Sequence, residues 1–197
     1  MLQIKEIVNS IFTSKTYILF KEKEKEAWLV DIGDIEPVMT FLEKEGLYVK
    51  GVLLTHAHFD HIYGLPELVK ICPNCNVYVT EYAKEALASD KLNMSRYHDT
   101  PMKYNGDNVI MVHEGDEMVL FEREPEIRFF ETPGHNPGCL TMMIGDYIFT
   151  GDSYIPGIGV TCQVPHANKE QAKQSMERIL RLAEGKKIFS GHQIDNN

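Results

Sequence analysis

The chain has 197 residues, of which 43% are hydrophobic, enough for one sizeable core but short for two full domains. Acidic residues outnumber basic ones by 29 to 20, which gives a formal net charge of −9. Because phosphate contacts need concentrated positive charge, neither nucleic acid nor an anionic membrane is expected as a partner. The N-terminus lacks a signal-peptide pattern and no run approaches membrane-spanning length, so we expect a cytoplasmic protein with one domain, residues 1–197.

Strand and helix patterns alternate along the first half of the chain. Hydrophobic patterning predicts strands at residues 16–20, 27–33, 49–54 and 76–80, and helices at 35–46, after His61, and at 81–89. The charged residues 21–26 are typical of an exposed hairpin end. Residues 91–108 are polar and contain Pro101 and Gly106, so we expect a loop or a lid there.

The second half is richer in strand patterns and ends with one long helix. Strands are predicted at residues 109–113, 117–122, 126–134, 139–145, 146–152 and 186–192. A helix is predicted at 168–185, with Asn168 as its N-cap, Gln171 at the capping-box position and Gly185 at its end. Strands separated by helices in both halves predict an α/β fold with helices on the outer faces.

The four cysteines give no strong functional signal. Cys72 and Cys75 form a CPNC motif, but the chain has neither the second CxxC of a zinc ribbon nor a thioredoxin-like strand and helix around it. A turn with two incidental thiols is the favoured interpretation. Cys139 is expected to pack in the interior rather than to take part in chemistry.

The segment LLTHAHFDHIYG, residues 53–64, places four metal-binding side chains within six positions. His56 and His58 lie two residues apart at the end of an apolar strand, so in an extended chain they point to the same side and can chelate one ion. Asp60 and His61 follow where the chain should turn into a helix, and they can face a neighbouring position. In a core, each of these side chains would need its own polar partner, so the cluster indicates a metal site that could hold two ions.

Three later residues have a matching context. His135 lies between two Pro and Gly turn pairs in ETPGHNPG. Asp152 and His192 each follow an apolar strand, a small hydroxyl residue and a glycine, in YIFTGD and KIFSGH. The glycine removes side-chain bulk where the backbone must come close to a metal centre. These three residues strengthen the prediction of a metal site.

Taken in order, the motifs THAHFDH, TPGHNPG, FTGD and SGH resemble those of the metallo-β-lactamase fold superfamily of hydrolases. The resemblance implies a four-layer αββα sandwich with metals at one edge of two packed sheets. It implies a first ion held by His56, His58 and His135, and a second held by Asp60, His61 and His192. It also implies that Asp152 bridges both ions.

Within this superfamily, the chain is most similar to small glyoxalase II-like (hydroxyacylglutathione hydrolase-like) members. A bridging aspartate such as Asp152 is typical of that group and generally absent from true β-lactamases, while histidine at position 58 differs from the glutamate of diiron flavoproteins. Typical glyoxalase II has a helical C-terminal region that holds glutathione, whereas five residues follow His192 here, so glutathione recognition is not implied. Lys91, Arg96 and Lys103 of the polar loop could supply a smaller anion site.

The implied cofactors are two divalent metal ions, with zinc expected first and iron or manganese as alternatives. We expect a small-molecule substrate whose thioester or ester carbonyl is attacked by a metal-bridged hydroxide, with Asp60 taking part in catalysis. A rival hypothesis is a persulfide dioxygenase with a mononuclear iron held by His56, His135 and Asp152. A lactonase or phosphodiesterase of the same fold, or a metal-binding protein without catalytic activity, is also compatible with these residues.

Candidates for the wall of the substrate pocket come from the neighbours of these residues. Phe59, Tyr63 and Tyr154 are adjacent or close to predicted ligands, and His166 lies in the segment after Asp152 that should border the metals. His98 and His113 have no ligand-like neighbours in the sequence and are not expected to belong to the site.

Overall fold

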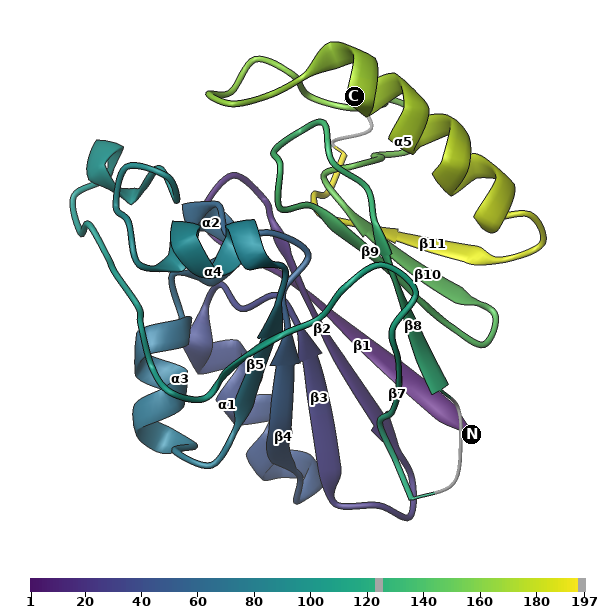
Figure 1. The fold of residues 1–197 in the computed structure, drawn as a ribbon. Helices are drawn as coiled ribbons and strands as arrows, with labels where there is room; N and C mark the ends of the chain where they lie inside the picture. Colours follow the sequence, from purple (N-terminus) through teal and green to yellow (C-terminus); the bar gives the residue numbers. More distant parts are fainter. Residues whose placement is uncertain (123–125, 195–197) are drawn as a thin grey trace.

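Two β-sheets packed face to face form the centre of the computed structural model, which describes residues 1–122 and 126–194 (Figure 1). The first sheet has the strand order β1-β2-β3-β4-β5-β6. Its strands are β1 (Leu2–Val8), β2 (Lys15–Lys21), β3 (Glu26–Val30), β4 (Tyr48–Leu53), β5 (Asn76–Val79) and β6 (Val109–Met111). The second sheet has the order β11-β10-β9-β8-β7. Its strands are β7 (Glu117–Val119), β8 (Glu126–Glu131), β9 (Leu140–Ile144), β10 (Tyr147–Gly151) and β11 (Lys187–Ser190).

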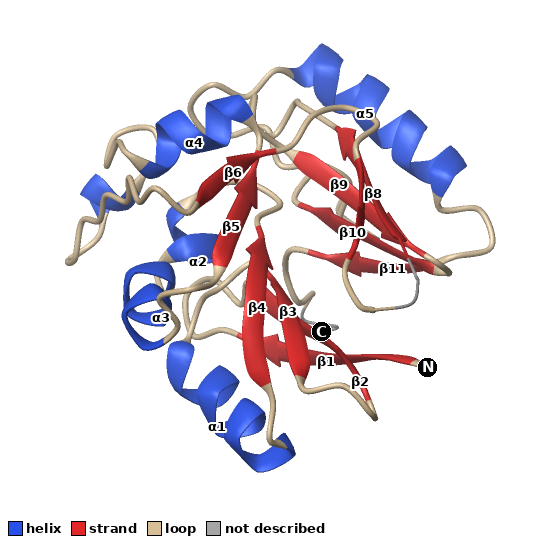
Figure 2. Ribbon diagram, turned by 60° about the horizontal axis from the view of Figure 1, so that its bottom comes forward, coloured by secondary structure: helices blue, strands red, loops and turns tan. Residues whose placement is uncertain are grey.

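Helices cover the outer face of each sheet (Figure 2). The helices next to the first sheet are α1 (Ile35–Glu45), α2 (Phe59–Ile62), α3 (Leu65–Ile71) and α4 (Glu81–Leu87), whereas α5 (Lys169–Leu182) lies over the second sheet. Strands β3 to β6 pair in parallel, as expected where helices connect successive strands. The chain therefore has the predicted αββα order of layers.

Strands of the first sheet are apolar on both faces because each face contributes to a different core. In β3, Leu29 packs into the cluster shared with α1, α3 and α4, while Trp28 and Val30 pack into the cluster between the two sheets. Phe129 and Phe149 fill this second cluster from the opposite sheet. Since successive side chains of a strand point to opposite faces, one apolar strand can serve both cores.

Several elements differ from the prediction. The N-terminal strand β1 was not predicted, although it pairs antiparallel with β2 along its whole length. The helix expected after His61 is two short helices, α2 and α3, and β6 and β7 are shorter than the predicted strands. Residues 91–108 are a loop as expected, with one turn of 3-10 helix at Ser95–Tyr97. Within the described residues, no helix combines the length and the apolar character needed to cross a membrane.

The loops that carry the predicted ligands all follow the carboxyl ends of strands. The connection after β4 contains His56 to His61, and the one after β8 contains His135. Asp152 and His192 follow β10 and β11, which are parallel neighbours. Strand ends from both sheets thus bring these residues to one edge of the sandwich, which is where α/β folds commonly bind ligands.

Candidate metal centre

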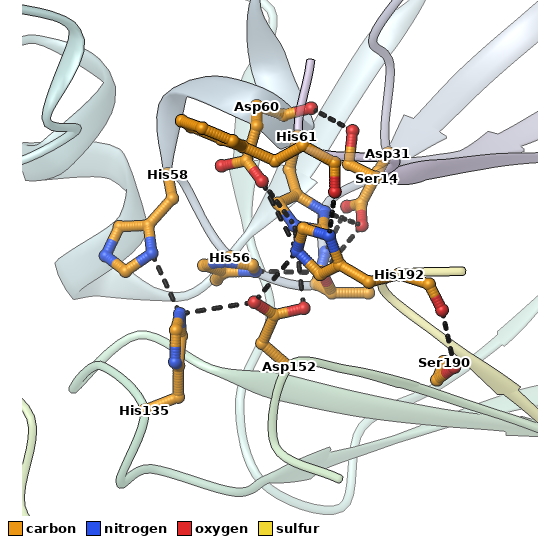
Figure 3. Close-up of polar contacts among 12 residues, drawn as sticks. Ser14, Asp31, His56, His58, Asp60, His61, His135, Asp152, Ser190 and His192 are labelled. Atoms are coloured by element: carbon orange, nitrogen blue, oxygen red, sulfur yellow. Dashed lines mark hydrogen bonds and ion pairs between the residues drawn. The ribbon is translucent and has the colours of Figure 1, made fainter. Parts of the chain in front are cut away.

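Seven imidazole and carboxylate side chains converge at the edge where the two sheets meet (Figure 3). They form three overlapping groups, and within each group the nitrogen and oxygen atoms lie within 4.8 Å of one another and could hold a metal ion. The groups are His56, His58 and His135; His56, His61 and Asp152; and Asp60, His61 and His192. All seven residues predicted as ligands are therefore brought together.

In the group of His56, His58 and His135, three imidazoles face one another in a buried position. His58 Nδ1 lies 2.9 Å from His135 Nε2, and His56 Nε2 is buried without a hydrogen-bond partner among the described residues. The other ring nitrogens of two of these residues have partners: His135 Nδ1 lies 2.7 Å from the carbonyl oxygen of Thr161, and His56 Nδ1 lies 3.1 Å from Thr55 Oγ1. A proton held at Nδ1 leaves Nε2 as an electron-pair donor toward the centre, as a metal ligand requires.

The group of Asp60, His61 and His192 combines two imidazoles with one carboxylate. Asp60 Oδ2 lies 3.5 Å from His61 Nε2 and 3.3 Å from His192 Nε2. His192 Nδ1 donates to the backbone carbonyl oxygen of Phe12 over 2.8 Å, which again directs Nε2 toward the centre. This group is less buried than the three imidazoles, since Asp60 and His192 are partly exposed.

Asp152 lies between these two groups. Its Oδ2 is 3.4 Å from His135 Nε2 and 3.2 Å from His192 Nε2, and its Oδ1 is 3.5 Å from His61 Nε2. Oδ1 is also buried and has no hydrogen-bond partner in the described part of the chain. A buried carboxylate oxygen without a partner is costly unless a cation completes its environment.

Asp31, which was not predicted to belong to the site, contacts the imidazole of His61 at Nδ1, the ring nitrogen that faces away from the other ligands. Its Oδ2 lies 2.9 Å from His61 Nδ1, and its two carboxylate oxygens accept hydrogen bonds of 2.7 Å from the backbone N–H and the hydroxyl of Thr55. Asp31 directly follows β3 and has a φ of 57°, a conformation that is unusual for a residue other than glycine. In the sequence, an acidic residue directly after an apolar strand was the one available signal.

The pKa values of three histidines in the cluster are shifted in directions that favour the binding of a cation. Burial, followed by the neighbouring imidazoles, lowers the pKa of His56 well below its usual value and that of His58 to about 3, so both are in the neutral form that binds metal. Burial also opposes charge on His61, but the carboxylates of Asp60, Asp152 and Asp31 outweigh it and raise its pKa to about 10. These carboxylates therefore require positive charge beside His61, which a divalent ion would supply.

Glycines next to the ligands allow the backbone to approach the centre, as the repeated motif predicted. A Cβ atom on Gly191 would lie 2.1 Å from Asp152 Oδ1 and 3.0 Å from His61 Cε1. Gly151 has a φ of 48°, and a Cβ there would lie 2.6 Å from the side chain of Thr55. Any larger residue at position 191 would displace the carboxylate of Asp152.

A cavity of about 380 Å³ opens above the cluster, and Phe59 lines it together with His58, Asp60, His135, Asp152 and His192. Three other residues proposed for its wall, Tyr63, Tyr154 and His166, are not among the lining residues. The Tyr63 hydroxyl instead donates to Asp34 Oδ1 on another part of the surface.

His98, which was not expected to belong to the site, does line this cavity. Its ring packs against that of Phe59 with a centroid distance of 4.3 Å. Lys91, Arg96 and Lys103 do not line the cavity, and the last two pair with Asp90 at 3.3 and 3.4 Å. The anion site suggested for these three residues is therefore not formed at the cavity.

Comparisons with known proteins match the sequence and the fold of this chain. The family model described as "Metallo-beta-lactamase superfamily" matches residues 13–192. A hydroxyacylglutathione hydrolase from Vibrio cholerae is 29% identical over 194 residues, which cover 98% of this chain but 66% of that relative. The solved structure of the B3 metallo-β-lactamase BLEG-1 has a TM-score of 0.85 and 27% identity, covering 98% of this chain and 92% of that one. TTHA1623, solved in a di-iron-bound form, has a TM-score of 0.81 and 25% identity, covering 96% of this chain and 92% of that one.

Proposed function

Because the chain belongs to the metallo-β-lactamase superfamily, we propose that it is a dinuclear metal-dependent hydrolase that cleaves a thioester or an ester. The observation that carries this proposal is the position of Asp152, whose Oδ2 lies near an imidazole of each group, His135 and His192, while its Oδ1 lies near His61. The Vibrio cholerae relative, by its name a hydrolase of a glutathione thioester, supports the choice of reaction. Since the chain spans 66% of that relative, glutathione itself does not follow as the substrate.

The residues present fit two metal ions. His56, His58 and His135 would hold one ion, while Asp60, His61 and His192 would hold the other, with Asp152 between them. The fit rests on His56 Nε2 and Asp152 Oδ1, two buried atoms that have no hydrogen-bond partner in the described part of the chain. Metal ions would satisfy both atoms, because each atom offers an electron pair and no proton.

Two divalent ions held this way would supply an acidified water and would polarise a carbonyl oxygen, the second effect being worth several kcal/mol in metal hydrolases. The chain's own residues provide the positioning. Asp31 and the carbonyl oxygen of Thr161 fix the orientation of His61 and His135 through hydrogen bonds to their Nδ1 atoms. Asp60 lines the cavity and contacts the imidazoles through Oδ2, so its Oδ1 is available to accept a proton or a hydrogen bond from the reacting groups.

We propose zinc as the metal, with iron or manganese as alternatives. Imidazole nitrogens and carboxylate oxygens bind all three metals, and the described residues of the cluster are histidines and aspartates alone. TTHA1623 was solved in a di-iron-bound form, which gives iron specific support as the second choice.

The decisive experiment combines elemental analysis with a substrate screen. Protein loaded in turn with zinc, iron and manganese is tested on a thioester, an ester, a lactone, a β-lactam and a phosphodiester. We expect about two ions per chain and hydrolysis of the thioester or ester, with both the second ion and the activity lost in Asp60→Ala. Asp146→Ala, which removes an exposed carboxylate from the turn between β9 and β10, is the matched control. Fewer than one ion per chain under metal-replete conditions, with Asp60→Ala fully active, would refute the proposal.

The same protein samples separate the rival functions. Oxygen uptake with a persulfide by the iron-loaded protein, without thioester hydrolysis under argon, would assign a dioxygenase instead. Cleavage of the lactone or the phosphodiester alone would keep the metal centre and replace the substrate class. Bound metal without turnover of any substrate would indicate a binding protein.

A further inference from the structure

Aromatic and aliphatic side chains from four segments of the chain line part of the cavity above the metal cluster. Phe12 comes from the turn between β1 and β2, Phe59 from α2 and His98 from the loop after α4, and these three form an aromatic group. Ile155, Ile158 and Val164 all come from the connection between β10 and α5 and form an aliphatic group. Both groups line the same cavity as the proposed metal ligands.

The aromatic group is ordered by contacts between its members and with the metal cluster. The His98 ring lies 4.3 Å from the Phe59 ring at 31° and 5.7 Å from the Phe12 ring at 65°. Phe12 has a φ of 52°, and its carbonyl oxygen accepts the hydrogen bond from His192 Nδ1. This turn therefore fixes a proposed ligand with its backbone, and its side chain, which is 66% exposed, stands at the rim of the cavity.

The aliphatic group is held in a similar way. Ile155 and Gly159 exchange two backbone hydrogen bonds of 2.7 and 2.8 Å, so the chain forms a tight turn with Ile158 near its tip. Ile158 is 58% exposed and lines the cavity. The same connection reaches the metal cluster through Thr161, whose carbonyl oxygen is bonded to His135 Nδ1. Exposed apolar side chains at the rim of a site lose contact with water only when a ligand covers them, which favours apolar ligands.

Charged groups are confined to the floor of the cavity. Among the described residues that line it, the carboxylates are the proposed metal ligands Asp60 and Asp152, and no lysine or arginine is present. Arg96 and Lys103, in the loop that also contains His98, each form an ion pair with Asp90. A carboxylate on the substrate chain would thus lose its hydration against an apolar wall, and no ion pair with the wall would compensate for that cost.

We propose that the cavity takes a carbonyl substrate whose acyl chain is apolar and uncharged, and that Phe12 and Ile158 determine this specificity. This inference rests on the proposed function, because the carbonyl of such a substrate must reach the metal cluster. The volume of about 380 Å³ lies near the lower end of the range for ligand pockets, so the acyl chain is short.

The test uses thioesters of N-acetylcysteamine, an uncharged thiol, carrying acetyl, hexanoyl or succinyl groups. We expect kcat/KM for the hexanoyl thioester to exceed that for the succinyl thioester by about 10-fold or more. Ile158→Lys should lower kcat/KM for the hexanoyl substrate and raise it for the succinyl substrate, because the added ammonium can pair with the succinyl carboxylate. Phe12→Ala should lower kcat/KM for the hexanoyl substrate more than for the acetyl substrate. Leu180→Lys is the matched control, since Leu180 is a 46% exposed leucine of α5 that does not line the cavity.

A binding measurement keeps this inference separate from the proposed function. Metal-free protein is titrated with hexanamide or succinamate while the methyl signals of Ile158 are followed by NMR. Stronger binding of hexanamide, with shifts at Ile158, supports the inference even if no thioester is hydrolysed. Equal affinity for the two amides, or equal kcat/KM for the hexanoyl and succinyl thioesters in wild type and Ile158→Lys, would overturn it.

Discussion

Replacing Asp31 by asparagine is expected to weaken the binding of one metal ion while the fold is retained. In the structure, one carboxylate oxygen of Asp31 accepts the backbone N–H of Thr55, and the other contacts both the Thr55 hydroxyl and His61 Nδ1. An asparagine of nearly the same shape keeps an oxygen for the Thr55 N–H. Its NH₂ group then faces His61 and cannot accept the Nδ1 proton.

The size of the effect follows from the loss of that one contact. A hydrogen bond to a charged group contributes about 1.5–3 kcal/mol, which corresponds to about 10- to 150-fold in affinity. This agrees with the roughly 10- to 100-fold loss of metal affinity that is typical when the partner of a ligating histidine is changed. The substitution also favours the His61 tautomer with its proton on Nε2, which removes the electron pair from the atom that faces Asp60 and Asp152.

The assay is a competition titration of metal-free protein against a chromophoric zinc chelator, with the tautomer of His61 followed by ¹⁵N NMR. Asp34→Asn is the matched control, because Asp34 lies three residues further along and accepts hydrogen bonds from Ser10 and Tyr63 rather than from a histidine. If Asp31→Asn bound both ions as tightly as wild type, or if Asp34→Asn weakened binding equally, Asp31 would not act by orienting His61.

Three further predictions concern the cluster and the helix beside it. Asp152→Asn should retain at most one ion per chain in native mass spectrometry, because the carboxylate between the two groups is lost; two tightly bound ions would argue against its bridging role. Gly191→Ala should lower the metal content, since its Cβ would lie 2.1 Å from Asp152 Oδ1. Gly46→Ala has open space around the Cβ, so it should keep the metal content and lose about 1–2 kcal/mol of stability from its φ of 67°. Asn168→Ala removes the side chain that caps α5 and should lower the free energy of unfolding by about 1 kcal/mol, and Tm by about 2–4 °C, with kcat/KM unchanged.

The proposed ligands could be found in the sequence because they stand out locally. His56, His58, Asp60 and His61 occupy six positions, and Asp152 and His192 share one motif of strand, hydroxyl residue and glycine. Asp31 gives a weaker signal, a single acidic residue directly after an apolar strand. It is 24 residues from Thr55 and 30 from His61, and the three become neighbours because β3 pairs in parallel with β4.

The wall of the cavity was harder to predict because it depends on tertiary contacts between loops. His98 lies in a polar segment without periodicity, and it enters the cavity by packing against Phe59 and Phe12, 39 and 86 positions earlier in the sequence. Tyr154 is close to Asp152 in sequence but does not line the cavity. Strand β1 was missed for a related reason: its Lys5 and Glu6 are exposed at the edge of the sheet, so its sequence lacks the apolar run of a buried strand.

The position of the cluster also links metal binding to the packing of the two sheets. The residues from His56 to His61 follow a strand of the first sheet, whereas His135, Asp152 and His192 follow strands of the second. Direct contacts join the same segments: the N–H of Leu140 donates to the carbonyl oxygen of Thr55 over 2.7 Å, and Gly151 packs against the Thr55 side chain. Any ion held by His56 and His135 together would therefore join the two sheets. Because such a site exists only when both sheets are packed, the free energy of metal binding adds to the stability of the fold. Substitutions in the core between the sheets should in turn reach the metal centre by changing the distance between the two sets of ligands.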